Sequence, residues 1–322
     1  MNKLRPVRHD RLCGIQYLRA MAALMVVYYH MLDRVPALTP ALSESRWLDT
    51  SLLGDGGVDI FFVISGYIMW SVCRNDTPLR FILRRIFRIV PLYWLLTGLA
   101  IAMTILTPTL FHAHSMTARH IEASFLFFPY PKGDYPLVKP GWSLDLEMAF
   151  YGLFALALFL PLRYRLWAVG AVLCAATLAG FFVTSPLAKF YTQPLMLEFW
   201  LGMVLAHFTR ALPRWVSLLC LVGGFAALLE QQHWHALAAT AVVAGGSTIK
   251  LPSMGWALLL GDASYSIYLT HVFVLNATRP FFENLPAAAF AVSTLACVIV
   301  VALLSYQLIE RPLMKRLVLR RI

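Results

Sequence analysis

Residues 12–32 read LCGIQYLRAMAALMVVYYHML, an apolar run long enough to cross a bilayer as one helix. Two ionisable residues, Arg19 and His30, interrupt this run. Eleven positions at about 100° each come to roughly three turns, so a helix places both side chains on one face, about 16 Å apart along its axis. Because a charge in hydrocarbon costs several kcal/mol, that face is expected to meet protein or a water-filled cavity. The run therefore predicts a membrane-spanning helix with a functional polar stripe.

The composition of the whole chain is that of a polytopic membrane protein. Of its 322 residues, 60% are hydrophobic and only 13% are charged. Many apolar stretches approach the length of about 20 residues that a helical span needs. We therefore expect an all-α integral membrane protein that forms a single domain over residues 1–322, with about ten transmembrane helices. The expected spans are 12–32, 55–73, 86–107, 141–160, 166–184, 193–209, 214–230, 234–250, 255–277 and 287–309.

Positive charge is distributed unevenly between the segments that join these spans. If the N-terminus is cytoplasmic, the inner segments carry 19 of the 27 Lys and Arg residues, and the outer segments carry seven. This asymmetry follows the positive-inside rule and predicts that both termini are cytoplasmic. The net charge of +11 is thus explained by topology, and binding to nucleic acid is not expected.

Histidines outside the predicted spans do not suggest a metal site. His112 and His114 form one His-x-His pair in an outer segment, and His233 and His235 form another. No third ligand with suitable spacing accompanies either pair, so solvated loop histidines are expected and no metal is predicted. The five cysteines fall in or beside the spans and are expected to be structural thiols.

The longest segment between spans, residues 108–140, is expected to be a non-helical outer loop. It is rich in aromatic residues, among them Phe127, Phe128, Tyr130 and Tyr135. Such rings stack on sugars, but they also collect at membrane interfaces, and the residues alone leave both interpretations open.

Arginines gather near the predicted cytoplasmic face. Arg84, Arg85 and Arg88 open the third span, and Arg19 lies in the inner half of the first. Arginine binds phosphate oxygens in bidentate geometry, so four guanidinium groups near the same face of the membrane suit a polyanionic ligand. Arg84 and Arg85 also serve the positive-inside topology, which is the alternative explanation for these two.

Histidines and carboxylates gather near the opposite face. They are His30, Asp59, Asp145, Glu147 and His271. General base catalysis on a hydroxyl group uses an imidazole to take the proton and a carboxylate to fix its tautomer. The alternative is a structural cluster that joins helices through interhelical hydrogen bonds.

Six sequence blocks follow one another along nearly the whole chain. They are IQYLRA at 15–20 with His30, GVDIFFVISGY at 57–67, RRIFR at 84–88 with PLYW at 91–94, GWSL at 141–144 with Glu147 and Tyr151, SYSIYLTH at 264–271, and ERP at 310–312. Each block alone is moderately specific. The ordered set resembles the membrane-bound acyltransferase 3 family, and within it the short, ExoZ-like exopolysaccharide O-acetyltransferases.

The residues themselves and this resemblance together suggest roles for particular side chains. His30 is expected to act in acyl transfer, and three further catalytic candidates are Asp59, Glu147 and His271. The co-substrate acetyl-CoA is expected to bind four arginines, Arg19, Arg84, Arg85 and Arg88. The acceptor is expected to contact three residues of the fourth span, Trp142, Asp145 and Tyr151.

Together these expectations describe a multi-pass enzyme of the bacterial inner membrane. It would move an acetyl or short acyl group from cytoplasmic acyl-CoA to a hydroxyl of an exported polysaccharide or its lipid-linked precursor. Longer members of the family add a C-terminal SGNH hydrolase-like domain, which is not expected here because the chain ends about ten residues after Pro312. One alternative is a transporter or flippase of a lipid-linked glycan, because polar stripes in helical bundles also mark substrate routes. A second alternative is a membrane protein with a scaffolding role. No matching pair of Gly/Pro-broken segments suggests the inverted repeats of a transporter.

Overall fold

The computed structural model describes residues 9–32, 50–107, 116–129, 135–208, 212–229, 235–249, 251–282 and 285–319. These residues form helices, turns and short connections, and no strand occurs among them. The chain divides into two compact units. Unit 1 contains Met1–Arg74 and Leu197–Tyr265, and unit 2 contains Asn75–Met196 and Ser266–Ile322. The all-α fold class is therefore confirmed for the described residues.

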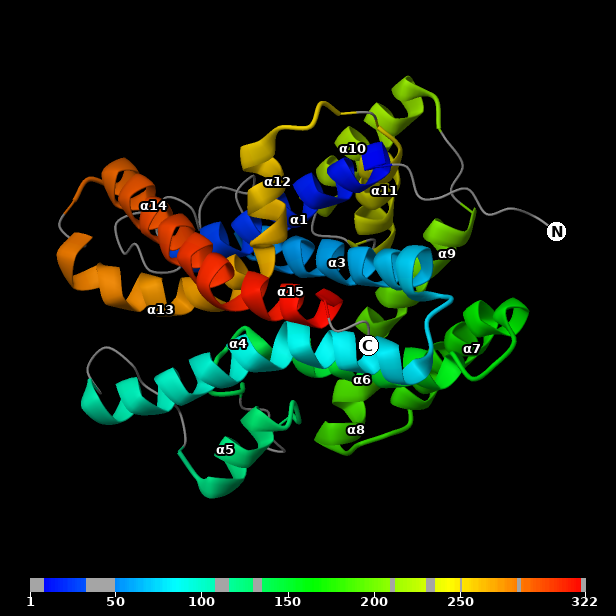
Figure 1. Ribbon diagram of the computed structural model, residues 1–322, viewed down its shortest axis with the longest axis horizontal. Coiled ribbons are helices and arrows are strands. Elements are labelled where there is room, and N and C mark those ends of the chain that lie inside the picture. Colours follow the sequence, from blue (N-terminus) through cyan, green and yellow to red (C-terminus); the bar gives the residue numbers. More distant parts are fainter. Residues whose placement is uncertain are drawn as a thin grey trace. The chain divides into compact units, whose positions relative to one another are not determined.

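Unit 1 is a bundle organised around its first two helices. Its elements are α1 (His9–Leu32), α3 (Thr50–Ile68), the π-helical turn η1 (Met69–Cys73), α9 (Leu197–Phe208), α10 (Arg214–Leu228), α11 (His235–Thr248) and α12 (Gly255–Asp262). Helix α1 packs against α3, α11 and α12, while α3 also packs against α9 (Figure 1). Helix α11 packs in addition along α10.

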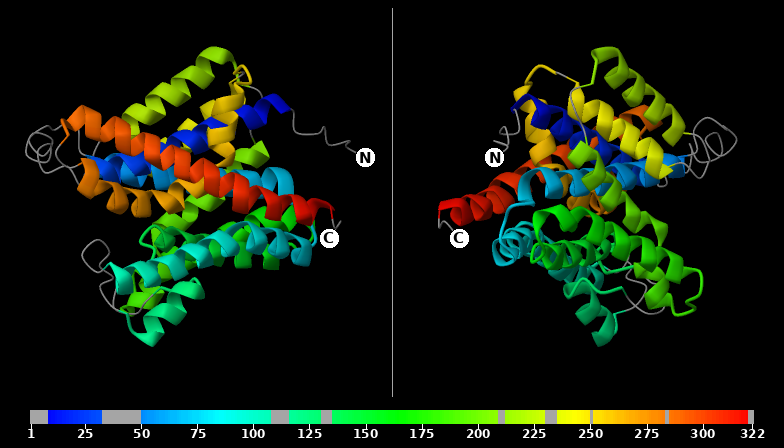
Figure 2. Two further views of the ribbon diagram at one scale, coloured as in Figure 1. Left: turned by 60° about the vertical axis from the view of Figure 1, so that its left-hand side comes forward. Right: turned by 90° about the vertical axis from the view of Figure 1, so that its right-hand side faces the viewer.

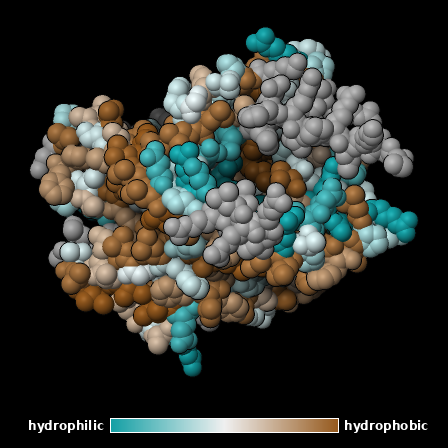
Figure 3. Space-filling model, in the orientation of Figure 1, coloured by the Kyte–Doolittle hydropathy of each residue, from teal (hydrophilic) through white to brown (hydrophobic). Residues whose placement is uncertain are grey.

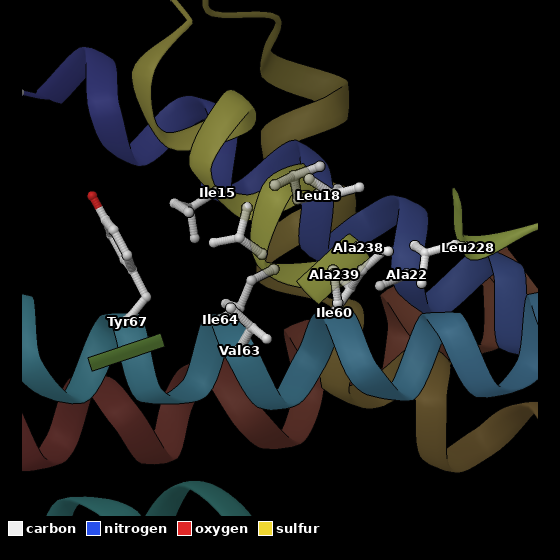
Figure 4. Close-up of a cluster of buried hydrophobic side chains, with 12 residues drawn as sticks. Ile15, Leu18, Ala22, Ile60, Val63, Ile64, Tyr67, Leu228, Ala238 and Ala239 are labelled. Carbon is white, nitrogen blue, oxygen red and sulfur yellow. The ribbon is translucent and has the colours of Figure 1, made fainter. Parts of the chain in front are cut away.

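The core of unit 1 combines branched side chains with small residues. Figure 4 shows Ile15 and Leu18 of α1 and Ile60 of α3 directed toward the alanines of α11. Glycine permits the closest contacts between backbones. A Cβ atom at Gly14 would collide with the carbonyl oxygen of Gly246 on α11. Small residues at helix interfaces are typical of membrane bundles, where packing drives association.

Unit 2 is organised around the long helix α4. Its elements are α4 (Pro78–Leu106), α5 (Ala118–Phe125), α6 (Gly141–Ala157), α7 (Leu162–Gly180), α8 (Pro186–Tyr191), the 3₁₀ turn η2 (Pro194–Met196), most of α13 (Ser264–Phe282), α14 (Ala287–Ser305), the π-helical turn η3 (Tyr306–Glu310) and α15 (Arg311–Leu319). Helix α4 packs against α5, α6, η3 and α15. Figure 2 shows α14, η3 and α15 as one continuous rod.

The start of α4 is defined by local sequence. Thr77 Oγ1 accepts a hydrogen bond from the backbone N–H of Arg80, and Pro78 occupies the first helical position. This combination satisfies an otherwise unpaired N–H group and begins the helix with a residue that lacks one. The cap therefore fixes the residue at which α4 begins, a few positions before its arginines.

Each of the ten predicted spans coincides with a helix, but not every helix meets the requirements of a span. Within the described ranges, four helical segments are long and apolar enough to cross a membrane: Leu53–Cys73, Pro78–Leu106, Leu162–Gly180 and Ala288–Lys315. The bent pair α12 and α13, separated at Ala263, adds a fifth if it forms one span. Multiple membrane spans are thus supported, whereas the number ten is not confirmed. The expectation that residues 108–140 lack helix is wrong, because α5 lies within them.

The surface of unit 2 carries large apolar side chains along α4 and α14. On α4, Leu95 and Leu106 are 55% and 77% exposed, and on α14 Val292 is 70% exposed. Figure 3 shows such apolar side chains over both helices on its visible face. Soluble monomers rarely expose apolar surface so extensively. These faces are suited to contact with lipid.

Candidate active site

Arg19 and His30 both lie on α1, which confirms that the first hydrophobic run is a single helix. Arg19 is buried, with only 7% of its surface exposed. Its Nη1 donates a 3.0 Å hydrogen bond to Oε1 of Gln16, whose Nε2 donates a 2.8 Å bond to Oδ1 of Asp262 on α12. The guanidinium group is therefore oriented by a polar network that joins α1 to α12.

His30 lies in the last turn of α1 and is half-buried. Its ring centroid is 4.8 Å from that of Tyr29. The C-terminal end of a helix carries a partial negative charge, which stabilises a cation within the last turn. An imidazole at this position is suited to accept a proton, because the resulting imidazolium is stabilised by the helix end.

Asp59 forms a buried carboxyl pair with a residue that the sequence did not nominate. The side chain of Asp59 on α3 lies close to the carboxyl group of Glu198 on α9. The two residues are 5% and 3% exposed. Two ionised carboxylates at such a buried site would repel each other, so the arrangement favours a state in which one of them holds a proton.

His235 extends this pair toward the surface of unit 1. Its Nδ1 lies 3.6 Å from Oδ2 of Asp59, and its side chain is 26% exposed. His235 begins α11, so the expectation of a solvated loop histidine is wrong for this residue. The other three histidines of the two pairs, His112, His114 and His233, lie outside the described residues.

In unit 2, α4 and α6 bring together four of the predicted residues. The guanidinium carbon of Arg85 lies 5.7 Å from the ring centroids of both Phe81 and Tyr151. The Tyr151 hydroxyl donates a 2.5 Å hydrogen bond to Oε1 of Glu147. Arg88, three positions after Arg85 on the same helix face, also acts electrostatically on Tyr151. The cluster thus places two cations beside a hydrogen-bonded hydroxyl and carboxylate.

Arg84 points to a different environment from its neighbour. Its Nη1 forms a 3.1 Å ion pair with Oδ2 of Asp76, and 45% of its side chain is exposed. Consecutive helical residues diverge by about 100°, so Arg84 and Arg85 occupy different faces of α4. The structure separates the two arginines that the sequence grouped together.

His271 is fully buried on α13. Its Nδ1 lies 2.6 Å from the backbone oxygen of Tyr268, which can only accept, so Nδ1 carries the proton and Nε2 is the basic nitrogen of the neutral ring. The Tyr268 hydroxyl donates a 3.0 Å hydrogen bond to the Pro140 oxygen and lies 2.7 Å from Oγ of Ser143. These bonds fasten α13 to the start of α6.

The remaining predicted residues lie in the first turns of α6. Trp142 is half-buried, whereas Asp145 is 1% exposed. Burial and the nearby Asp145 carboxylate raise the pKa of Tyr191, on α8, to about 12. Within the described residues, no group of three or more His, Cys, Asp and Glu side chains is placed to hold a metal ion.

Comparison with known proteins covers most of the chain. A family model described as an acyltransferase domain matches residues 14–306, which include every candidate residue named above. The chain is 37% identical over 300 residues to the exopolysaccharide production protein ExoZ of Rhizobium meliloti (strain 1021), covering 84% of this chain and 92% of that protein. No solved structure matches the chain significantly.

Two further relatives extend the comparison. Acyltransferase MdmB of Streptomyces mycarofaciens is 28% identical over 372 residues, which cover 98% of this chain and 95% of MdmB. O-acetyltransferase OatA of Staphylococcus aureus (strain NCTC 8325 / PS 47) is 26% identical over 361 residues, which cover 94% of this chain and 57% of OatA. The similarity therefore runs over nearly the whole chain in each case.

Proposed function

The chain belongs to the acyltransferase family that this domain defines, and from that premise we propose that it acetylates a polysaccharide at the bacterial inner membrane. It is an O-acyltransferase of a membrane-bound kind. In our proposal the donor is cytoplasmic acetyl-CoA or another short acyl-CoA, and the acceptor is a hydroxyl of an exported polysaccharide or its lipid-linked precursor. The acceptor class follows from the similarity to ExoZ, an exopolysaccharide production protein, and to the O-acetyltransferase OatA.

The contact of Arg85 with Tyr151 is the observation that supports a CoA donor. The guanidinium plane packs near two aromatic rings, while phosphate is recognised by the N–H groups at the edge of that plane. Arg88 adds a second cation on the same face of α4, so the diphosphate of CoA would meet two donors. Arg84, which is paired with Asp76, would make a weaker contribution.

His30 is the residue to which we assign proton transfer. The acceptor oxygen forms a bond to the thioester carbonyl carbon as the carbon–sulfur bond breaks. His30 takes the hydroxyl proton, and the CoA thiolate leaves and is protonated to the thiol. In a second route, His30 first carries the acetyl group as an acyl-imidazole and then passes it to the hydroxyl. Arg19 would meet the pantetheine arm or thioester of the donor.

Asp59, Glu147 and His271 complete the proposed catalytic set. Glu147, held by Tyr151, is the first choice for orienting the acceptor or a proton-carrying group. His271, with its tautomer set by Tyr268, offers a second basic nitrogen. Asp59 is engaged with Glu198 and His235, so we assign it a supporting role.

The topology that suits this reaction has ten crossings with both termini in the cytoplasm. The excess of Lys and Arg in the inner segments supports it, because the donor is cytoplasmic and basic residues remain on that side. Lipids would cover the apolar faces of α4 and α14.

Radiolabelled acetyl-CoA tests the proposal directly. Membranes that contain the protein are incubated with acetyl-labelled donor, and the polysaccharide is isolated and treated with mild alkali. Label that enters the polysaccharide and is released by alkali supports ester formation. In parallel, acetyl-CoA should raise the melting temperature of the purified protein more than an adenosine nucleotide without the pantetheine arm. Absence of both label and shift would contradict the proposal and favour a transporter of a lipid-linked glycan.

A further inference from the structure

Asp145 is a buried acid with no hydrogen-bond partner in the described part of unit 2. Only 1% of the residue is exposed, and neither Oδ1 nor Oδ2 meets a donor among the described residues. An unpaired buried carboxyl group costs several kcal/mol unless a ligand or water satisfies it. Asp145 therefore requires a partner from outside the described chain.

A second polar group of unit 2 is oriented toward the same region. Tyr93, on α4, is fully buried, and its hydroxyl has no hydrogen-bond partner of good geometry among the described residues. The neighbouring Thr97 hydroxyl already donates its proton to the Tyr93 backbone oxygen, at 2.9 Å. Asp145 lies four positions after Gly141 on the same face of α6, and a Cβ atom built at Gly141 would lie 2.7 Å from the Tyr93 hydroxyl oxygen. Two complementary groups, an acceptor and a hydroxyl, thus lie near one another without bonding directly.

The position of the Tyr93 side chain is closely constrained. A Cβ atom at Gly141, the first residue of α6, would lie 2.7 Å from the Tyr93 hydroxyl oxygen, so only glycine leaves room for it. On another side the Tyr93 ring packs against Phe127, with 4.5 Å between centroids. Phe127 has a φ of 55°, a conformation that costs a residue other than glycine about 1 kcal/mol or more. The glycine at position 141 and the contact with Phe127 therefore hold the Tyr93 hydroxyl beside the start of α6.

We propose that Asp145 and Tyr93 bind a hydroxyl group of the sugar acceptor, with Asp145 accepting its hydrogen bond and Tyr93 donating one. A sugar hydroxyl both donates and accepts, and so satisfies both side chains at once. Partly exposed Tyr191, which senses the Asp145 charge, connects this pair to the surface of unit 2. The assignment rests on the proposed acetylation of a polysaccharide and identifies which side chains recognise its acceptor.

Two conservative substitutions test the pair. Asp145→Asn keeps the shape but replaces one carboxyl oxygen with an amide NH₂ group, and Tyr93→Phe removes only one oxygen atom. The matched controls are Glu122→Gln and Tyr164→Phe, which change exposed residues of α5 and α7 in the same way. The acceptor probe is polysaccharide from the producing cells, stripped of its acetyl groups by mild alkali, and the donor is radiolabelled acetyl-CoA.

Each variant should raise the KM for stripped polysaccharide roughly tenfold, the effect of losing one buried hydrogen bond. Acetyl-CoA hydrolysis without acceptor, and stabilisation by acetyl-CoA, should remain at the level of the controls. The double variant should lose less than the product of the single effects, because both side chains serve one hydroxyl.

An unchanged KM in both variants would overturn the assignment and leave only a structural water at this position. Loss of acceptor-independent hydrolysis together with a lowered melting temperature in both variants would also overturn it, because that result indicates a structural role. If the unaltered protein fails to label polysaccharide at all, the proposed function itself fails, which separates the two conclusions.

Discussion

The Tyr151 hydroxyl donates a 2.5 Å hydrogen bond to Oε1 of Glu147, one turn earlier on α6, while the ring of Tyr151 lies 5.7 Å from the Arg85 guanidinium carbon. One side chain thus contacts both a carboxylate and a cation. Glu147 is thereby held in one orientation, and Arg85 is held against α6. Removing the hydroxyl alone separates these two effects.

Tyr151→Phe should lower the rate of polysaccharide acetylation about tenfold while leaving the KM for acetyl-CoA nearly unchanged. The ring that packs near Arg85 remains, but Glu147 loses a hydrogen bond worth about 1–2 kcal/mol. Steady-state kinetics with labelled acetyl-CoA provide the measurement, and Tyr164→Phe is the control. A rate equal to that of the unaltered protein would show that Glu147 does not depend on Tyr151.

Arg85→Lys should raise the KM for acetyl-CoA about tenfold, because lysine cannot reproduce the planar, bidentate contact with phosphate. Arg84→Lys is the matched comparison and should change the KM less than threefold, since Arg84 is half-exposed and paired with Asp76. Acetyl-CoA titrations followed by thermal stabilisation report the difference. Equal effects at the two positions would contradict the division of roles.

His30→Ala should abolish acetylation of polysaccharide, because the variant lacks the imidazole to which we assign the hydroxyl proton. The variant should still insert into membranes and be stabilised by acetyl-CoA. Labelled product is measured in membranes with matched amounts of protein. Acetylation close to normal would remove His30 from the mechanism.

Glu198→Gln should lower the free energy of unfolding by less than about 1 kcal/mol, because the amide can replace the shared proton as donor to Asp59. Asp59→Leu should cost about 2–4 kcal/mol, since it leaves the Glu198 carboxyl group and His235 without this buried partner. Melting temperatures of the purified proteins compare the two. Equal losses in both variants would argue against a shared proton.

Gly66→Ala should destabilise unit 1 by several kcal/mol. The added Cβ would collide with the backbone oxygen of Phe199, and a backbone contact cannot relax as a side chain does. Gly98→Ala is the control, since nothing lies within 4 Å of its Cβ, and it should be neutral or stabilise α4 by about 0.5–1 kcal/mol. Thermal unfolding with intact membrane insertion is the readout. A stable Gly66→Ala protein would mean that α3 and α9 can separate.

Hydropathy predicted the helices well because a bilayer imposes a simple requirement on length and polarity. Every expected span contains a helix, and the pairing of Arg85 with Arg88 on one face follows from their spacing of three residues. The break at Ala263 was not predicted, because the run from 255 to 277 contains no proline and is mostly apolar. The short helix α5 was missed because its polar residues resemble those of a loop.

The contacts of the predicted site residues were harder to predict than their positions. Asp59 meets Glu198 and His235, which are distant in sequence, and no local pattern links residues on three different helices. The missing partner of Asp145 is likewise a property of its surroundings in the fold. The sequence shows which polar residues would be unfavourable to bury, whereas the packing of the helices shows what each of them contacts.

The π-helical turn η3 gives the rod formed by α14 and α15 an unusual sensitivity to register. A π-turn contains one residue more than an α-helical turn, so each residue after it is rotated by about 100° from an uninterrupted helix. Within this turn Glu310 is 5% exposed and accepts a 3.1 Å hydrogen bond from Ser266 of α13. Deletion of one residue from 306–310 would restore a regular helix, withdraw Glu310 from Ser266 and rotate α15 relative to α4. The single extra residue therefore sets the rotation of α15 about the helix axis relative to α14.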